Sequence, residues 1–169
     1  IGTSGSIGQS FLDQYIVDEE VSHIYSFARR ELSIESKKVT HHFIDICDES
    51  TITAAIKMLP ETICFDIIIV ATGILHSGTI QPEKTIKSLR EKNFLDVLKI
   101  NTVGPSLILK CFLSYLRPKK RAIFAILSAR VGSISDNRLG GWYSYRASKA
   151  ALNMIIKTTA IEQKRIDPE

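Results

Sequence analysis

The sequence predicts a doubly wound α/β fold, in which helices cover both faces of a parallel sheet. Short runs rich in β-branched and aromatic residues alternate along the chain with helical patterns, as expected when helices connect parallel strands. The run FDIIIVAT at 65–72 is apolar enough for a central strand that is buried on both sides. A glycine-rich turn precedes the first helical pattern. With 169 residues the chain has the length of one domain, and we expect one.

The expected elements alternate from the first helix onward. Strands are expected at 23–28, 39–45, 65–72 and 122–128. Helices are expected at 7–20, 49–59, 94–116 and 143–164, with Asp48 as the N-cap of the second. The glycine turn follows Ile1 at once, so the strand that should feed it is nearly all missing. We therefore expect the sequence to be part of a longer chain that also carries further C-terminal strands.

Composition narrows the class of protein. Hydrophobic residues make up 44% of the chain and charged residues 24%, as in soluble globular proteins, and no stretch approaches the roughly 18 apolar residues of a membrane span. The net charge of +4 suits a protein that handles anions, without requiring a nucleic-acid partner. Cys47, Cys64 and Cys111 show no metal-ligand spacing. We expect no metal, no disulfide framework, no membrane and a cytoplasmic location.

The turn IGTSGSIG indicates a phosphate-binding loop. Gly2, Gly5 and Gly8 lie where a strand should meet a helix. Glycines there let the backbone approach a pyrophosphate, which then lies on the amides and the positive dipole of the helix N-terminus. An ordinary glycine-rich loop is the alternative, because a lone motif of this kind is weak.

The end of the second expected strand bears on the choice of cofactor. A fold of this type that prefers NAD usually has an acid about 20 residues after the glycines, which binds the ribose 2′-hydroxyl. Here Ala28 is followed by Arg29 and Arg30, and arginine suits a 2′-phosphate. The sequence therefore favours NADP(H) over NAD(H), with Arg29 as the contact. The alternative is that both arginines open a solvated helix.

The stretch YSYRASKA at 143–150 places Tyr145 and Lys149 four residues apart in a helical pattern. Residues at this spacing are neighbours on a helix surface. A cation close to a phenol lowers the phenol pKa, which makes Tyr145 a candidate general acid or base. The alternative is a packed tyrosine beside a solvated lysine.

Four motifs together resemble the short-chain dehydrogenase/reductase family, and within it the C-factor-like and sniffer-like carbonyl reductase branch. They are the glycine turn, ATG at 71–73, NTVGP at 101–105 and YSYRASKAALN at 143–153. The resemblance covers nearly the whole chain and implies a Rossmann fold. It also implies an NAD(P)-dependent enzyme that interconverts a carbonyl and an alcohol.

The resemblance assigns roles to the residues of these motifs. Tyr145 would be the proton donor to the carbonyl, Lys149 would lower its pKa and bind the nicotinamide ribose, and Asn101 would hold a water in a proton relay. Asp45, with Ile46 beside it, would contact the adenine. The expected cofactor contacts are Gly2, Ser4, Gly5, Ser6, Ile7, Gly8, Arg29, Asp45, Ile46, Ala71, Thr72, Gly73, Tyr145 and Lys149.

Two positions depart from the family pattern. Ser6 stands where the family usually has a glycine, and a serine hydroxyl there can still face phosphate. Ala129 stands where the family has its catalytic serine. Loss of that hydroxyl removes one hydrogen bond to the substrate carbonyl, a cost on the order of 100-fold in rate unless another group replaces it. Ser128 and Ser133 are the candidate substitutes.

Two functions remain open at this point. The first is an NADP(H)-dependent oxidoreductase acting on a small carbonyl or alcohol, which intact Tyr145, Lys149 and Asn101 favour. The second is a non-catalytic nucleotide-binding sensor or signalling protein, which Ala129 favours. By resemblance, we expect a homodimer or homotetramer built on the two long helices.

Overall fold

The computed structural model describes residues 1–32 and 34–166, and its backbone forms two compact units. The first comprises Ile1–Thr72 and Leu107–Leu127. The second is made of the described residues within Gly73–Ser106 and Ser128–Glu169. The expectation of a single domain stays a prediction.

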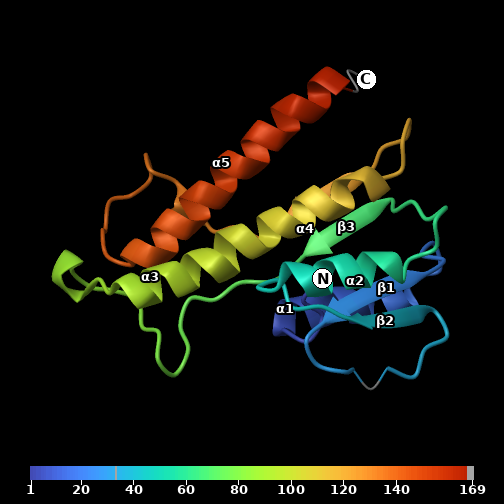
Figure 1. Cartoon of the computed structure of the whole chain (residues 1–169), viewed down its shortest axis with the longest axis horizontal. Coiled ribbons are helices and arrows are strands. Elements are labelled where there is room, and N and C mark those ends of the chain that lie inside the picture. Colours follow the sequence, from blue (N-terminus) through green and yellow to red (C-terminus); the bar gives the residue numbers. More distant parts are fainter. Residues whose placement is uncertain (33, 167–169) are drawn as a thin grey trace. The chain divides into compact units, whose positions relative to one another are not determined.

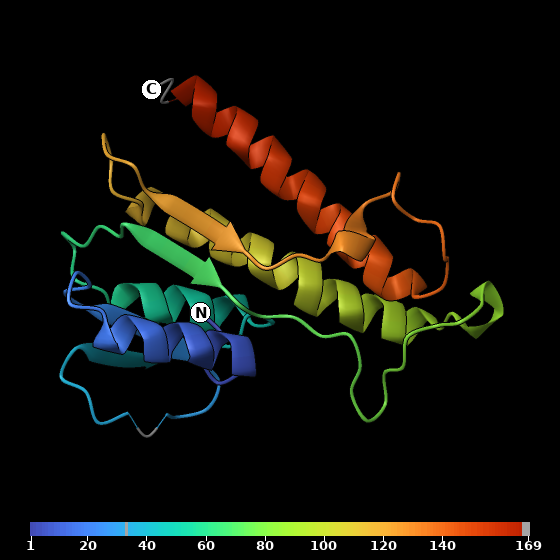
Figure 2. The ribbon, with the colours of Figure 1, turned by 180° about the vertical axis from the view of Figure 1, so that it is seen from behind.

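The strands of the first unit form two parallel pairs. β1 (Ile24–Ala28) pairs with β2 (Val39–Phe43), and β3 (Ile67–Val70) pairs with β4 (Ile123–Ile126), with each pair running in the same direction (Figure 2). All four match expected strands and are shorter by one to four residues. Parallel pairing explains their β-branched composition, because such strands are buried by the helices that connect them.

Ile1 and Gly2 connect the two strand pairs. The Gly2 amide donates to the Phe27 carbonyl in β1, and the Ala71 amide after β3 donates to the Ile1 carbonyl, both at 2.8 Å. A cavity of about 520 Å³ lies beside them, lined by residues of β1 and β3 that include Tyr25 and Ile67.

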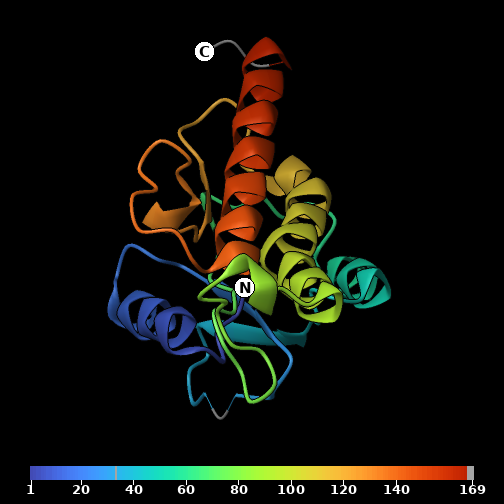
Figure 3. The ribbon, with the colours of Figure 1, turned by 90° about the vertical axis from the view of Figure 1, so that its left-hand side faces the viewer.

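Helices cover both faces of the β1–β2 sheet. α1 (Ser6–Val17) packs on β1 and α2 (Glu49–Lys57) on β2, and the two helices lie on opposite sides of the strands (Figures 1 and 3). The Asp48 side chain accepts a hydrogen bond from the Ser50 amide and caps α2, as predicted. α4 (Gly104–Phe112) is tied to α2 through a 2.9 Å ion pair between Lys110 and Glu49. The doubly wound α/β fold is confirmed.

The second unit is built on helices. α3 (Glu91–Leu98) continues through a π-helical segment, η2 (Lys99–Val103), into α4, which is followed by the short η3 (Leu113–Tyr115). α5 (Tyr143–Ile166) packs along α3 and η2, and Figure 3 shows α3 and α5 side by side. Two short 3₁₀ helices, η1 (Ile86–Ser88) and η4 (Arg130–Gly132), lie in the connecting loops. The expected helix at 94–116 is thus confirmed and begins earlier, at Glu91. The expected helix at 143–164 is also confirmed and ends later, at Ile166.

The continuous helical run Glu91–Tyr115 is more apolar than expected. It has 25 residues and a mean hydropathy of 1.2 in its most apolar window, so by length and composition it could cross a membrane. In that window 44% of the residues are buried. A core helix of a soluble protein has the same properties, and the packing of α3 and η2 against α5 buries apolar side chains of this run.

Candidate functional site

The glycine turn of the first unit has no room for a side chain at residues 2 and 8. Gly2 has a φ of +90°, and a Cβ at this residue would lie 2.8 Å from the Thr72 Cγ2. A Cβ at Gly8 would overlap the carbonyl of Gly2. The Gly5 amide closes the turn by donating to the Gly2 carbonyl at 3.0 Å. Glycine is therefore required at residues 2 and 8 for steric reasons.

Polar groups beside this turn suit a phosphate-bearing ligand. No side chain caps the N-terminus of α1, where Ser6 and Ile7 are exposed in the first turn. The Thr72 hydroxyl, at the end of β3, is buried without a hydrogen-bond partner among the described residues. Helix N-termini bind anions through their free amides and dipole, so the residues present fit the expected nucleotide.

Arg30 contacts this turn, whereas the sequence favoured Arg29 as the cofactor contact. Its guanidinium donates to the Ser4 carbonyl at 3.3 Å. Arg29, the residue selected from the sequence, is exposed one position earlier at the end of β1. Both cations therefore lie where β1 ends, and Arg30 is the one that the structure brings to the glycine turn.

The other expected contacts of the first unit lie at the ends of strands. The Asp45 carboxylate accepts a 2.9 Å hydrogen bond from the Cys47 amide and forms a local turn after β2. Ile46 is buried beside it. Ala71 follows β3 directly, next to Thr72. These residues follow the carboxyl ends of the parallel strands β2 and β3. Their contact with a nucleotide stays a prediction.

Asn101 organises the polar cluster of the second unit. It is fully buried in the π-helical η2, and its amide group binds both the amide and the carbonyl of Ile74, at 2.7 and 2.8 Å. The same amide donates to the Ser148 hydroxyl at 3.1 Å. Asn101 thus holds the segment after Gly73 against α5, which carries Tyr145. Single-turn π-helices occur frequently at functional sites.

Lys149 and Tyr145 lie together on α5. The Lys149 Nζ is 5.9 Å from the centre of the Tyr145 ring, and the lysine is 3% exposed. A Cβ at Gly73 would lie 3.4 Å from this Nζ and 3.5 Å from the Asn101 Oδ1, so Gly73 leaves the space before both groups open. Lysine, tyrosine and asparagine therefore form one cluster, as predicted.

The direction of the Tyr145 pKa shift differs from the expectation. Burial raises the pKa of Tyr145 and lowers the pKa of Lys149. The sequence-based prediction was that Lys149 lowers the Tyr145 pKa. That prediction is wrong for this structure, because the ammonium stands off the ring and the loss of solvent around the phenol has the larger effect.

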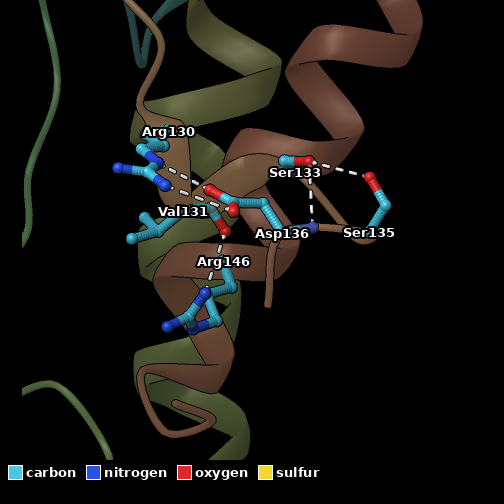
Figure 4. A network of polar contacts seen from close by, with 6 residues as sticks. All are labelled: Arg130, Val131, Ser133, Ser135, Asp136 and Arg146. Carbon is cyan, nitrogen blue, oxygen red and sulfur yellow. Dashed lines mark hydrogen bonds and ion pairs between the residues drawn. The ribbon is translucent and has the colours of Figure 1, made fainter. Parts of the chain in front are cut away.

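The two candidate serines have different surroundings. Ser128 donates to the Asn153 Oδ1 at 2.6 Å, which directs its hydroxyl along α5. Ser133 lies in the loop after η4, where its hydroxyl is 3.4 Å from the Ser135 hydroxyl and from the Asp136 amide (Figure 4). Neither serine contacts Tyr145 in the described structure.

The loop that carries Ser133 is held by charged groups. Arg130 binds the Asp136 carboxylate through two hydrogen bonds of 2.6 and 3.3 Å, and Arg146 of α5 donates to the Val131 carbonyl at 3.4 Å (Figure 4). Gly132 lies so close to α5 that a Cβ there would be 2.8 Å from the Lys149 Cβ. Gly132 is a further site residue that the sequence did not single out.

No group of three or more His, Cys, Asp or Glu side chains suited to a metal ion occurs in residues 1–32 and 34–166.

The chain is similar in sequence to proteins of a known family. Residues 7–166 match the family model of the short chain dehydrogenases. The chain is 25% identical to a benzil reductase ((S)-benzoin forming) of Bacillus cereus over 173 residues, with 96% of the chain and 66% of the relative covered. The chain thus spans about two thirds of the length of this relative.

Solved structures share the fold. The Caenorhabditis elegans carbonyl reductase Sniffer matches 97% of this chain and 77% of its own, with a TM-score of 0.85 and 23% identity. A short-chain dehydrogenase/reductase of Burkholderia multivorans with bound NADP covers 97% of this chain and 71% of its own, with a TM-score of 0.80 and 22% identity. The fold is therefore the doubly wound α/β fold of these solved structures. The chain belongs to the short-chain dehydrogenase family.

Proposed function

We propose that the chain is the cofactor-binding and catalytic part of an NADP(H)-dependent oxidoreductase that interconverts a carbonyl and an alcohol. The observation that carries the proposal is a cluster in which the buried Asn101 and Lys149 lie with the half-buried Tyr145. An ordinary surface tyrosine and lysine would be solvated. Here Lys149 is buried and Tyr145 is half-buried one helical turn away, and Gly73 leaves space before Lys149 and Asn101.

The residues divide the chemistry among them. The nicotinamide cofactor, when bound, supplies the hydride. The Tyr145 phenol donates the proton to the carbonyl oxygen, and its raised pKa keeps that proton in place at neutral pH. Lys149, whose Nζ lies 5.9 Å from the centre of the Tyr145 ring, would bind the nicotinamide ribose. Asn101 holds the backbone after Gly73, and a water bound to it would return a proton to the site.

The choice of NADP(H) rests on the cations at the end of β1. Arg29 and Arg30 stand where an NAD-preferring protein of this fold carries an acid, and Arg30 reaches the glycine turn. The NADP-bound relative described above is consistent with this choice. We therefore assign the 2′-phosphate contact to this pair of arginines.

A small carbonyl compound or alcohol is the proposed substrate. The relative named a benzil reductase makes benzil the first compound to test. An aromatic ring also lies beside the proton donor, because the Trp142 ring packs edge-on against Tyr145 at 6.3 Å. We further propose a cytoplasmic homo-oligomer that requires neither nucleic acid nor a membrane.

A second candidate is a nucleotide-binding sensor without turnover. Ala129 favours it, because the hydroxyl that this family uses on the substrate carbonyl is missing from residue 129. Both candidates predict cofactor binding, and only the first predicts reduction of a carbonyl.

The test begins with fluorescence titrations of the protein with NADPH and with NADH. NADPH should bind much more tightly than NADH. The double variant Arg29→Ala, Arg30→Ala should lose this preference, and Lys37→Ala, an exposed cation outside the site, should keep it. Failure of the folded protein to bind either nucleotide would refute both candidates.

Turnover separates the two candidates. NADPH oxidation in the presence of benzil or related carbonyls should depend on Tyr145, so Tyr145→Phe should lower kcat by roughly 100-fold or more while NADPH binding is kept. Binding without turnover of any carbonyl would favour the sensor.

A further inference from the structure

The helix that carries Tyr145 has no cap of its own. Trp142 precedes α5, and its carbonyl accepts the first helical hydrogen bond from the Arg146 amide at 2.8 Å. Trp142 therefore occupies the N-cap position, where the side chain usually supplies an oxygen to the amides of the first turn. Tryptophan has no such oxygen.

Glu83 supplies the missing oxygen from a distant loop. Its carboxylate accepts hydrogen bonds from the Ser144 amide, at 3.1 Å, and from the Ser144 hydroxyl. The Glu83 carbonyl accepts from the Trp142 amide. Glu83 is 6% exposed, and a buried carboxylate is costly unless several donors satisfy it. Here the donors are the amide and the hydroxyl of Ser144 at the start of α5, where the helix dipole favours negative charge.

The backbone that leads into α5 is unusual. Gly140, Gly141 and Trp142 all have positive φ angles, of 66°, 66° and 54°. For tryptophan this conformation is strained and persists only where its surroundings impose it. Arg146 holds the segment from one side through the carbonyls of Gly140 and Gly141, at 3.2 and 3.0 Å. The Glu83 carbonyl holds the segment from the other side, because it accepts a hydrogen bond from the Trp142 amide.

We propose that Glu83 is a positioning residue, which caps α5 and thereby fixes the phenol of Tyr145. Tyr145 directly follows Ser144, so any movement of the first turn moves the proton donor. Lys149 lies one turn further along the same helix and is affected less. The inference rests on the proposed function, because it assigns Tyr145 the role of proton donor.

The experiment compares Glu83→Ala and Glu83→Gln with Glu91→Gln. Glu91 is a matched control, because it is an exposed acid in the first turn of α3 in the same unit. Two readouts are taken on each folded variant. One is kcat and the KM for NADPH in carbonyl reduction. The other is acrylamide quenching of Trp142, the one tryptophan in the sequence, measured without cofactor.

We expect Glu83→Ala to lower kcat by roughly 10- to 100-fold, with the KM for NADPH changed about twofold or less. Trp142 should become more accessible to acrylamide. Glu83→Gln keeps one acceptor and the side-chain volume, so its effects should be intermediate. Glu91→Gln should behave as the unmodified protein. The intermediate Glu83→Gln keeps the test usable if Glu83→Ala fails to fold.

Unchanged kcat in both Glu83 variants would overturn the inference, whatever happens to Trp142. A loss of kcat without any change in quenching would also overturn it, because Glu83 would then act by another route. If the unmodified protein binds NADPH and reduces no carbonyl, the proposed function fails separately. Quenching of Trp142 still decides whether Glu83 caps α5: an increase in the Glu83 variants supports the cap, and no change refutes it.

Discussion

Tyr145 and Lys149 owe their ionisation to burial more than to each other. Loss of solvent raises the tyrosine pKa and lowers the lysine pKa, so both groups are pushed toward their neutral forms. A neutral phenol is the form that can donate a proton. The same environment therefore prepares Tyr145 for the reduction of a carbonyl.

The two directions of the reaction should depend oppositely on pH. Reduction needs the protonated phenol, so its rate should hold through neutral pH and fall as the pH rises through the elevated Tyr145 pKa. Oxidation of the alcohol needs the phenolate, so its rate should rise over the same alkaline range. Profiles of kcat against pH in both directions test this. A reduction rate that falls already between pH 6 and 8 would contradict the assignment of Tyr145.

The missing hydroxyl at Ala129 gives a second prediction at this scale. If Ser133 supplies the hydrogen bond to the substrate, Ser133→Ala should lower kcat on the order of 100-fold. Ser128→Ala should have a smaller effect, because the Ser128 hydroxyl is bound to Asn153. Ala129→Ser should rescue the Ser133→Ala variant. Equal losses in both single variants would show that neither serine is the specific substitute.

Sequence reasoning found the residues whose chemistry is visible in a short motif. Tyr145 and Lys149 are four apart on one helix, and helical periodicity alone places them together. Glu83 was missed, and Arg29 was preferred to Arg30, because the partners Ser144 and Ser4 lie 61 and 26 residues away from Glu83 and Arg30. A surface acid or arginine has the same appearance in a sequence as one that folds onto a helix end or a turn.

Among the elements, the helix from 91 to 112 shows what periodicity cannot predict. The amphipathic pattern indicated one long helix at 94–116, and the chain forms it. The π-helical segment Lys99–Val103 inside it has no clear residue signature, because it arises where the Asn101 side chain binds the backbone of Ile74. The strands were predicted by composition, and their exact ends depend on pairing partners in other parts of the chain.

The glycine turn gives a prediction at the scale of an element. Gly8→Ala would place a methyl group against the Gly2 carbonyl, so it should destabilise the fold by about 1–3 kcal/mol and abolish NADPH binding. Gly78→Ala is the matched control, because a Cβ at Gly78 meets no atom within 4 Å. Urea unfolding and NADPH titration of both variants test this. Equal stability of the two variants would contradict the packing argument.

For the whole molecule, the second unit offers exposed apolar side chains on two helices. Met154 and Ile161 are exposed seven residues apart on α5, and therefore on the same face. Leu95 and Val103 are exposed on the α3–η2 stretch. Helices of this kind suit the homodimer or homotetramer expected from the family resemblance.

The double variant Met154→Lys, Ile161→Lys should therefore reduce the molecular mass in solution to that of a monomer, because it places two charges in the proposed interface. Ala160→Lys adds charge to a different face of α5 and should leave the mass unchanged. Light scattering after size-exclusion chromatography measures both. A monomeric unmodified protein would refute the oligomer outright.

The doubly wound architecture was predictable because it follows from local patterns repeated along the chain. Alternating strands and helices leave few ways to cover a parallel sheet. The approach of Ile1 and Gly2 to both β1 and β3 was less predictable. It depends on which strand edges lie on either side of the glycine turn, and that information is spread over residues 1–71.

The π-helical segment at Lys99–Val103 has a consequence for how the sequence can change in evolution. A π-turn holds one more residue than an α-turn, so removal of a single residue there would turn the run from Glu91 to Phe112 into an uninterrupted α-helix. Such a helix would be at least as regular as the present one. One turn of either kind completes about 360°, so the flanking stretches would keep nearly the same facing, but the residues inside the segment would shift by one position. Asn101 would lose its alignment with Ile74 and Ser148. We therefore expect substitutions in this segment to be tolerated far better than deletions, and its length to be under stronger selection than its composition.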